Sequence, residues 1–140
     1  RGWPARAVYP GRKEMWIGIG LLLLGGLLVV ANLHRILGFD REWARATPSI
    51  FNYLARNFTP YTYLGFGMML VGLSPQLLFT DPPELVGALG GILTLLGIPI
   101  GLLSLVHWPL FLSPPWYRRW YRRGGRMGNN TPLWEPGERR

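Results

Sequence analysis

The sequence predicts an all-α integral membrane protein with three transmembrane helices and a short amphipathic helix in the loop after the first of them. The main observation is three apolar runs, over residues 15–33, 60–80 and 85–106, which hold 19, 21 and 22 residues and no Asp, Glu, Lys or Arg. A transmembrane helix needs about 20 residues of this kind. The segments that flank the runs are polar and rich in proline, so they leave too little apolar surface for a separate soluble core.

The first run follows a short basic arm, residues 1–14, and is expected to remain in the protein as transmembrane helix 1. It is longer than the apolar core of a signal peptide, which holds about 7–15 residues. Tyr9 and Trp16 flank its start. Aromatic side chains are enriched at this position because an amphipathic ring lies well at the boundary between lipid and water.

The loop over residues 34–59 is expected to contain a helix that lies in the membrane interface. Thr47 and Pro48 form a good helix start, with a hydroxyl at the N-cap and proline at the first helical position. The stretch that follows is too short to span a bilayer and has one apolar face, made of Ile50, Phe51, Leu54 and Phe58. Such a helix is typical of an interfacial segment, and an ordinary surface helix packed on neighbouring protein is the alternative.

The second and third runs, residues 60–80 and 85–106, are expected to form a tight antiparallel hairpin. Only the residues at 80–84 link them, and two of these are prolines, which prevent one continuous helix. A link this short keeps the two helices side by side.

Small residues recur on one face of each predicted transmembrane helix. Because apolar helices gain little from burying each other in lipid, close backbone approach at small residues drives much of their association. The spacing suits shallow left-handed crossings. The three helices can satisfy these faces among themselves, while the outward faces suit lipid or other membrane subunits. The expected packing residues are Gly18, Gly25, Gly65, Gly72, Gly90, Gly97 and Gly101.

The C-terminal segment, residues 107–140, is basic and aromatic and contains a four-residue repeat, Trp-Tyr-Arg-Arg, at 116–119 and 120–123. Prolines before it and glycines after it predict a short helix. We expect this helix to contact anionic lipids or an acidic partner, and the remainder to be a mobile tail. The alternative is an anchor that only fixes the topology. Nucleic-acid binding is not favoured, because the chain has a single short arginine- and glycine-containing stretch and it lies beside a membrane. The expected contact residues are Trp116, Arg118, Arg119, Trp120, Arg122 and Arg123.

Two histidines, His34 and His107, end the first and third runs, and the topology puts them at similar depth. Neutral imidazole is a good axial ligand, so the pair could hold a haem or a chlorophyll-type pigment. The alternative is two interfacial histidines without a ligand. The chain has no cysteine, which excludes cysteine-ligated zinc and iron–sulfur clusters, and no other metal site is expected.

The distribution of Lys and Arg predicts the orientation. With three spans, the N-terminal arm and the 80–84 turn share one side, with four basic residues, and the other side carries eleven. Because basic residues collect on the cytoplasmic side, the N-terminus is expected outside and the C-terminus in the cytoplasm. Arg outnumbers Lys by 14 to 1, which is typical of a GC-rich bacterial genome, so the expected location is the bacterial plasma membrane.

No catalytic or transport chemistry is expected. The apolar runs lack the ionisable side chains that mark ion and proton paths, and the chain has no recognisable nucleotide loop, metalloprotease motif or small-molecule site. The sequence therefore favours a non-catalytic accessory subunit of a larger bacterial membrane complex, respiratory or photosynthetic, that packs against other membrane subunits. The alternatives are a cofactor-carrying subunit that uses the two histidines and a small homo-oligomeric channel.

Overall fold

The structure, a computed structural model, describes residues 11–46, 58–106 and 108–138. Within these ranges all regular secondary structure is helical and no strand occurs, which confirms the all-α prediction. The α-helices are α1 (Arg12–Leu37), α2 (Thr59–Leu78), α3 (Glu84–Val106) and α4 (Pro115–Arg122), and two short 3₁₀ turns are η1 (Glu42–Ala44) and η3 (Leu110–Leu112). The amphipathic helix expected in the 34–59 loop falls mainly on residues 47–57, which lie outside the described part of the chain.

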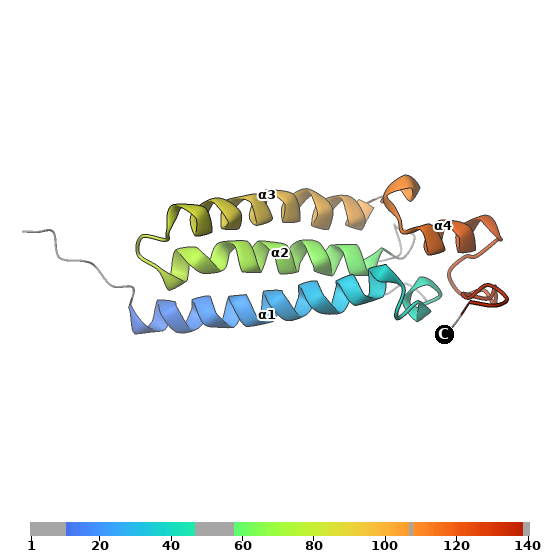
Figure 1. Ribbon diagram of the computed structural model, residues 1–140, viewed down its shortest axis with the longest axis horizontal. Helices are drawn as coiled ribbons and strands as arrows, with labels where there is room; N and C mark the ends of the chain where they lie inside the picture. The colour runs from blue at the N-terminus through green and yellow to red at the C-terminus, as the bar shows by residue number, and fades with distance from the viewer. Residues whose placement is uncertain (1–10, 47–57, 107, 139–140) are drawn as a thin grey trace, which may run out of the picture.

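The three long helices lie side by side in one flat layer, with α2 in the middle (Figure 1). The connection between α2 and α3 contains Pro82 and Pro83, and the two helices run antiparallel, as the sequence predicts. Two helices, α1 from Lys13 onward and α3, are long and apolar enough to cross a membrane. The middle helix, α2, is long enough, but its mean hydropathy falls below the value expected of a membrane span. The reason is that hydroxyl and amide side chains occur along its 20 residues.

Helix α1 is longer than the apolar run that predicts it, because local hydrogen bonds extend both ends. At its start the backbone N–H of Gly11 donates to the Glu14 carboxylate at 3.0 Å. At its end Gly38 adopts a left-handed conformation, with φ of 96°. Its N–H donates to the Arg35 carbonyl at 3.1 Å, and the next N–H, of Phe39, donates to the His34 carbonyl at 3.2 Å. This glycine-terminated end satisfies two carbonyls that the helix cannot satisfy itself.

Glycines set the spacing of the layer on both sides of α2. A methyl group added to Gly25 of α1 would lie 2.8 Å from the carbonyl oxygen of Gly67 of α2. One added to Gly65 would lie 2.6 Å from the carbonyl oxygen of Gly97 of α3. Real carbon atoms do not approach oxygen this closely, so any larger residue forces the helices apart.

The structure places all seven expected packing glycines at contacts between helices. Gly18 faces Leu78, while Gly72 and Gly90 meet each other, and Gly101 lies in ordinary contact distance of Thr62. Gly67 was missed. The spacing of the predicted glycines describes one small face per helix, whereas a middle helix has two neighbours and needs a small residue on each side.

Residues 38–46 and 108–138 fold together over the end of the layer where α1 and α3 finish, and we call this unit the cap (Figure 1). Its core is aromatic and includes the first turn of α2. The expectation of a mobile tail is wrong for the described residues, because Leu133 is only 2% exposed and packs in this core. The buried core residues are Trp43, Ala44, Phe58, Tyr61, Trp108, Trp116, Tyr117, Trp120 and Leu133.

Candidate functional site

The cap is built around α4, which carries the four-residue repeat. On this helix the two residues at the same position of the repeat lie on the same side. Four residues are close to one helical turn, so equivalent residues of the two copies lie above each other. The first position is occupied by Trp116 and Trp120, which are 5% and 1% exposed. These rings therefore contact the chain itself, and any lipid or partner contact of the repeat falls to its arginines.

The buried tryptophans attach the cap to the end of α1. The indole N–H of Trp116 donates to the Ile36 carbonyl at 2.9 Å, and that of Trp43 donates to the Arg35 carbonyl at 3.2 Å. Both carbonyls belong to the last turn of α1, where carbonyls lack the usual partner four residues on; that of Arg35 also accepts from the Gly38 N–H. The cap and α1 consequently meet through specific hydrogen bonds as well as through apolar contact.

The arginines of the repeat divide into two pairs with different surroundings. Those at the fourth position face the C-terminal carboxylates: Arg119 lies 3.0 Å from Glu135 and Arg123 lies 4.0 Å from the same side chain. Those at the third position, Arg118 and Arg122, have no carboxylate within ion-pair distance in the described part of the chain. The repeat therefore offers only half of its positive charge to an outside partner.

Arg41 connects the loop after α1 to the C-terminal segment. Its side chain is 11% exposed and forms an ion pair with Glu138 at 2.8 Å. It also donates to the carbonyls of Gly38 and Leu133, each at 3.2 Å. The guanidinium lies over the ring of Trp134, 3.9 Å from the ring centre. One arginine thus joins segments that are more than 90 residues apart in sequence.

The pKa of Glu138 is lowered from 4.5 to about 2, first by the hydrogen bond from Arg41 and then by the backbone N–H of Glu135. Because the folded pKa lies below the unfolded one, this contact contributes its full stability above about pH 4.5. The contribution is lost as the pH falls from there toward 2.

We therefore expect the C-terminal segment to lose protection from proteolysis or hydrogen exchange across this acidic window. Hydrogen exchange of residues 128–138, measured at several pH values with correction for the intrinsic rate, would show it. In Glu138→Gln the protection should already be low at neutral pH and should no longer follow this titration. Equal acid sensitivity in the variant and the parent would mean that another group is responsible.

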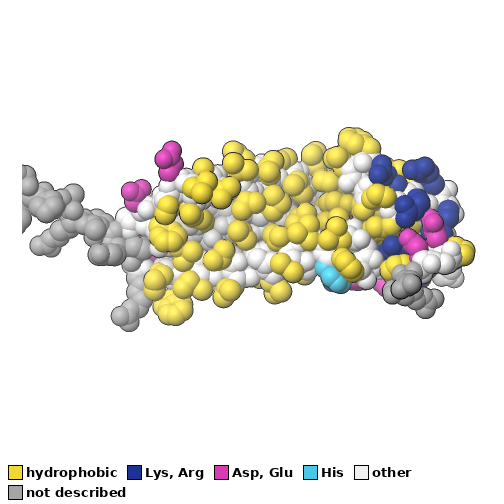
Figure 2. Space-filling view, in the orientation of Figure 1, with side chains coloured by type: hydrophobic (Ala, Val, Ile, Leu, Met, Phe, Trp, Pro, Cys, Tyr) yellow, Lys and Arg dark blue, Asp and Glu magenta, His cyan; other side chains and the backbone are white. Residues whose placement is uncertain are grey.

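Basic residues dominate the cap end of the molecule (Figure 2). The cap and the last turn of α1 hold eight arginines and four carboxylates among the described residues. The arginines are Arg35, Arg41, Arg45, Arg118, Arg119, Arg122, Arg123 and Arg126, and the carboxylates are Asp40, Glu42, Glu135 and Glu138. The described side chains along the middle of the layer carry no charge, so the charged side chains lie at its two ends and most of the arginines lie at the cap end.

Exposed apolar side chains surround the base of the cap. Leu37 and Phe39 at the end of α1 are 66% and 68% exposed, and Phe111 and Leu112 in η3 are 73% and 52% exposed. We call these four residues the collar. They lie at or just after the ends of α1 and α3, where the apolar layer meets the arginine-rich cap.

His34 is exposed in the last turn of α1, and its ring stacks on Phe39 with the ring centres 4.8 Å apart. His107 lies outside the described residues, so the expectation that the two histidines together hold a haem or pigment stays a prediction. Among the described residues, no group of three or more His, Asp and Glu is placed to hold a metal ion.

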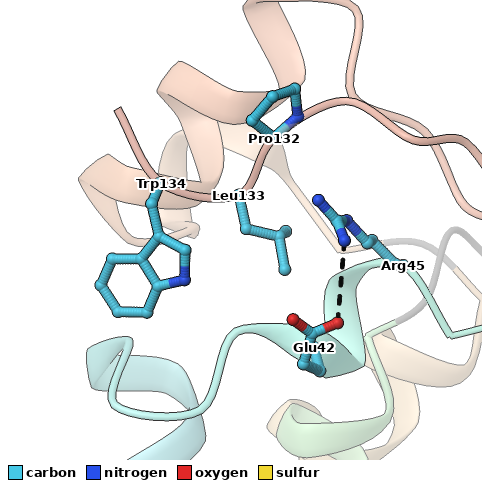
Figure 3. Close-up of a pocket in the computed structure, with 5 residues that line it drawn as sticks. All are labelled: Glu42, Arg45, Pro132, Leu133 and Trp134. Carbon is cyan, nitrogen blue, oxygen red and sulfur yellow. Dashed lines mark ion pairs between the residues drawn. The ribbon is translucent and has the colours of Figure 1, made fainter. Parts of the chain in front are cut away.

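Two small hollows lie within the cap. One, of about 280 Å³, is lined by Glu42, Arg45, Pro132, Leu133 and Trp134 (Figure 3). The other, of about 190 Å³, lies beside α4 and is lined by Tyr117, Trp120, Tyr121, Gly125, Arg126 and Met127. The first hollow is lined by side chains of opposite charge, Glu42 and Arg45, whereas the lining of the second contains no carboxylate.

Sequence reasoning missed the partners that hold the cap together. Arg41 and Arg45 lie in a loop with no regular pattern, and Glu135 and Glu138 lie in a segment expected to be mobile. The available signal was weak: two carboxylates three residues apart in an otherwise basic C-terminal segment. Their pairing with distant arginines depends on the fold.

A comparison with known protein families, with curated proteins and with solved structures finds no match for this chain. The interpretation of the cap therefore rests on its own geometry and charge.

Proposed function

We propose that this protein crosses a bilayer three times and serves as a non-catalytic accessory subunit of a larger bacterial membrane complex, with the cap fixed in the headgroup layer. The observation that carries this proposal is the folded, arginine-rich cap joined directly to one end of a helix layer whose middle is uncharged. The expected orientation has the cap in the cytoplasm, as the excess of basic residues on that side favours.

The length of the apolar surface supports the three-span topology. On α1, Trp16 and Leu37 are both strongly exposed and lie about 32 Å apart along a helix that rises 1.5 Å per residue. On α3 the same estimate applies between Leu85 and Val106, and the hydrocarbon core of a bilayer is about 30 Å thick. Because α2 lies between these two helices, it has to cross with them.

Two hydroxyls of α2, those of Thr62 and Ser74, are hydrogen-bonded within the layer, which also favours its insertion. The hydroxyl of Ser74 donates to the Val71 carbonyl at 2.7 Å. The hydroxyls of Thr62 and Ser104, on α2 and α3, lie 2.9 Å apart and share a hydrogen bond. Hydroxyls paired in this way cost little to bury in lipid and add specific contacts between helices.

The collar and the third-position arginines support the placement of the cap. Exposed Phe and Leu side chains enter the apolar edge of the interface, and arginines just beyond them meet lipid phosphates through two parallel hydrogen bonds. Arg118 and Arg122 are the repeat arginines that the C-terminal carboxylates leave available, so they are the proposed contacts with anionic lipid or an acidic subunit.

The flat layer supports a packing role. A layer one helix thick has two broad faces, and strongly exposed apolar side chains such as Leu23, Phe66 and Leu95 are suited to contact neighbouring subunits or acyl chains. The channel alternative requires the Gly97–Gly101 face to reach water, whereas that face packs against Gly65. The described part of the layer also lacks the buried charges that transport chemistry uses.

Replacing Arg118 and Arg122 with Gln should weaken the contact of the cap with anionic headgroups by about 2 kcal/mol, since each basic residue near a membrane surface contributes about 1 kcal/mol. The measurement is the amount of anionic lipid and of partner subunits that co-purify in mild detergent. Arg119→Gln with Arg123→Gln is the matched control. It removes the same charge from the same helix but should act by loosening the C-terminal segment. Unchanged lipid and subunit recovery in the first variant would contradict the proposal.

A further inference from the structure

We infer that the 280 Å³ hollow of the cap binds the phosphoethanolamine group of a membrane lipid (Figure 3). This inference rests on the proposed function, which puts the cap in the headgroup layer. The hollow is smaller than the sites of about 300–1,000 Å³ that hold drug-sized ligands, so it suits a headgroup better than a macrocycle. Its lining presents opposite charges and an indole, which together match a zwitterion.

The two charged side chains of the hollow are only weakly paired with each other. Arg45 Nη1 lies 3.9 Å from a carboxylate oxygen of Glu42, which is too far for a hydrogen bond. The Glu42 side chain is 74% exposed, and water screens such a pair strongly. A phosphate at Arg45 and an ammonium at Glu42 would therefore replace one weak contact with two charge-assisted hydrogen bonds.

Trp134 provides a second donor for the phosphate. Figure 3 shows its indole across Leu133 from the two charged side chains, with the nitrogen edge turned toward them. The indole N–H has no acceptor in the part of the chain that the structure describes. An indole N–H that faces a polar hollow is expected to find an acceptor, and a phosphate oxygen provides one.

The donors of the hollow are held in place before any ligand arrives. Arg45 Nη2 donates to the Thr131 carbonyl at 2.9 Å, and the Arg45 carbonyl accepts from the Gly128 N–H at 3.0 Å. Trp134 is fixed from one side by the guanidinium of Arg41. Because these side chains are already ordered, little conformational entropy is lost when a headgroup binds.

The same geometry predicts which headgroup is preferred. A primary ammonium can donate hydrogen bonds to the Glu42 carboxylate, whereas the quaternary ammonium of choline cannot. Choline is usually bound by a cage of several aromatic rings, and this hollow is lined by a single ring that already stacks with Arg41. A glycerol headgroup has no positive charge for Glu42. Ethanolamine is therefore expected to bind better than choline or glycerol.

The test uses the full chain in detergent and two pairs of probes. Soluble glycerophosphoethanolamine is compared with glycerophosphocholine, and micelles containing phosphatidylethanolamine are compared with micelles containing phosphatidylcholine, with native mass spectrometry as the readout. We expect ethanolamine to be preferred about fivefold in both pairs, which corresponds to one well-formed exposed ion pair. Glu42→Gln should abolish this preference while phosphate binding remains, and Glu84→Gln, at the opposite end of the molecule, should leave it intact.

Trp134→Phe keeps the stacking ring and removes the N–H, so it should weaken both headgroups of each pair to the same degree. Equal binding of ethanolamine and choline by the parent protein would overturn the inference while leaving the proposed subunit role standing. A preference seen with the soluble probes alone would overturn the assignment to a lipid. A preference that survives Glu42→Gln would show that another site binds the headgroup.

Discussion

Replacing Gly65 with Ala is expected to destabilise the helix layer by about 1–3 kcal/mol, the usual range for forcing extra carbon into a packed interior. The added methyl group would lie 2.6 Å from the Gly97 carbonyl oxygen and closer still to the Gly101 backbone nitrogen. Both neighbours are backbone atoms of α3, which a side-chain rotation cannot move away. The helices have to separate along their whole contact, and the Thr62–Ser104 hydrogen bond would lengthen with them.

Gly91→Ala is the matched control, because the same methyl group on α3 meets no atom within 4 Å. Alanine has the higher helix propensity, so this variant should be neutral or stabilised by up to about 1 kcal/mol. The measurement is reversible unfolding in mixed micelles followed by circular dichroism. Equal stability of the two variants would contradict the close contact between α2 and α3.

Replacing Arg41 with Met is expected to release the C-terminal segment from the cap at a cost of about 1.5–3 kcal/mol, the range for hydrogen bonds to charged groups. The Glu138 carboxylate, whose side chain is 27% exposed, would lose its main partner. The carbonyls of Gly38 and Leu133 would lose a donor each, and Trp134 would lose the cation that covers it. The helix layer does not depend on these contacts and should persist.

Limited proteolysis after residue 123 and hydrogen exchange of residues 128–138 would measure this release, and far-UV circular dichroism would report the helices. Arg122→Met removes an exposed arginine with no carboxylate partner among the described residues, so it should leave the segment protected. Arg41→Lys keeps the charge but loses the planar, multidentate geometry and should give an intermediate result. A protected segment in Arg41→Met would show that the aromatic core alone holds it.

The long helices could be predicted because their signal is local. Runs of uncharged residues fix the existence of α1, α2 and α3, and the prolines before Glu84 fix the hairpin. The end of α1 at Leu37 depended on Gly38, which terminates the helix four residues beyond the last residue of the apolar run. The role of Gly67 could not be read from spacing, since it depends on which helix lies in the middle.

The cap could not be predicted as a folded unit for a different reason. The repeat at 116–123 stood out, and its helix was expected, but its tryptophans were expected to face outward. The burial of Trp116 depends on Trp43 and on the Ile36 carbonyl of α1, which is 80 residues away in sequence, and the indole of Trp120 donates to the Thr131 carbonyl. Long-range polar contacts such as that of Arg41 with Glu138 produce no periodic pattern in the sequence. An arginine that binds its own chain therefore cannot be distinguished, from the sequence, from one that binds lipid.

The topology can be tested most directly by labelling single cysteines, because the chain has none of its own. Asp81→Cys lies in the turn between α2 and α3, Arg122→Cys lies on the cap, and Leu95→Cys lies on the exposed face of α3. The account predicts that a membrane-impermeant maleimide labels Asp81→Cys in intact cells, labels Arg122→Cys only after permeabilisation, and labels Leu95→Cys only after denaturation. Labelling of Asp81→Cys and Arg122→Cys from the same side of the membrane would contradict the three-span account.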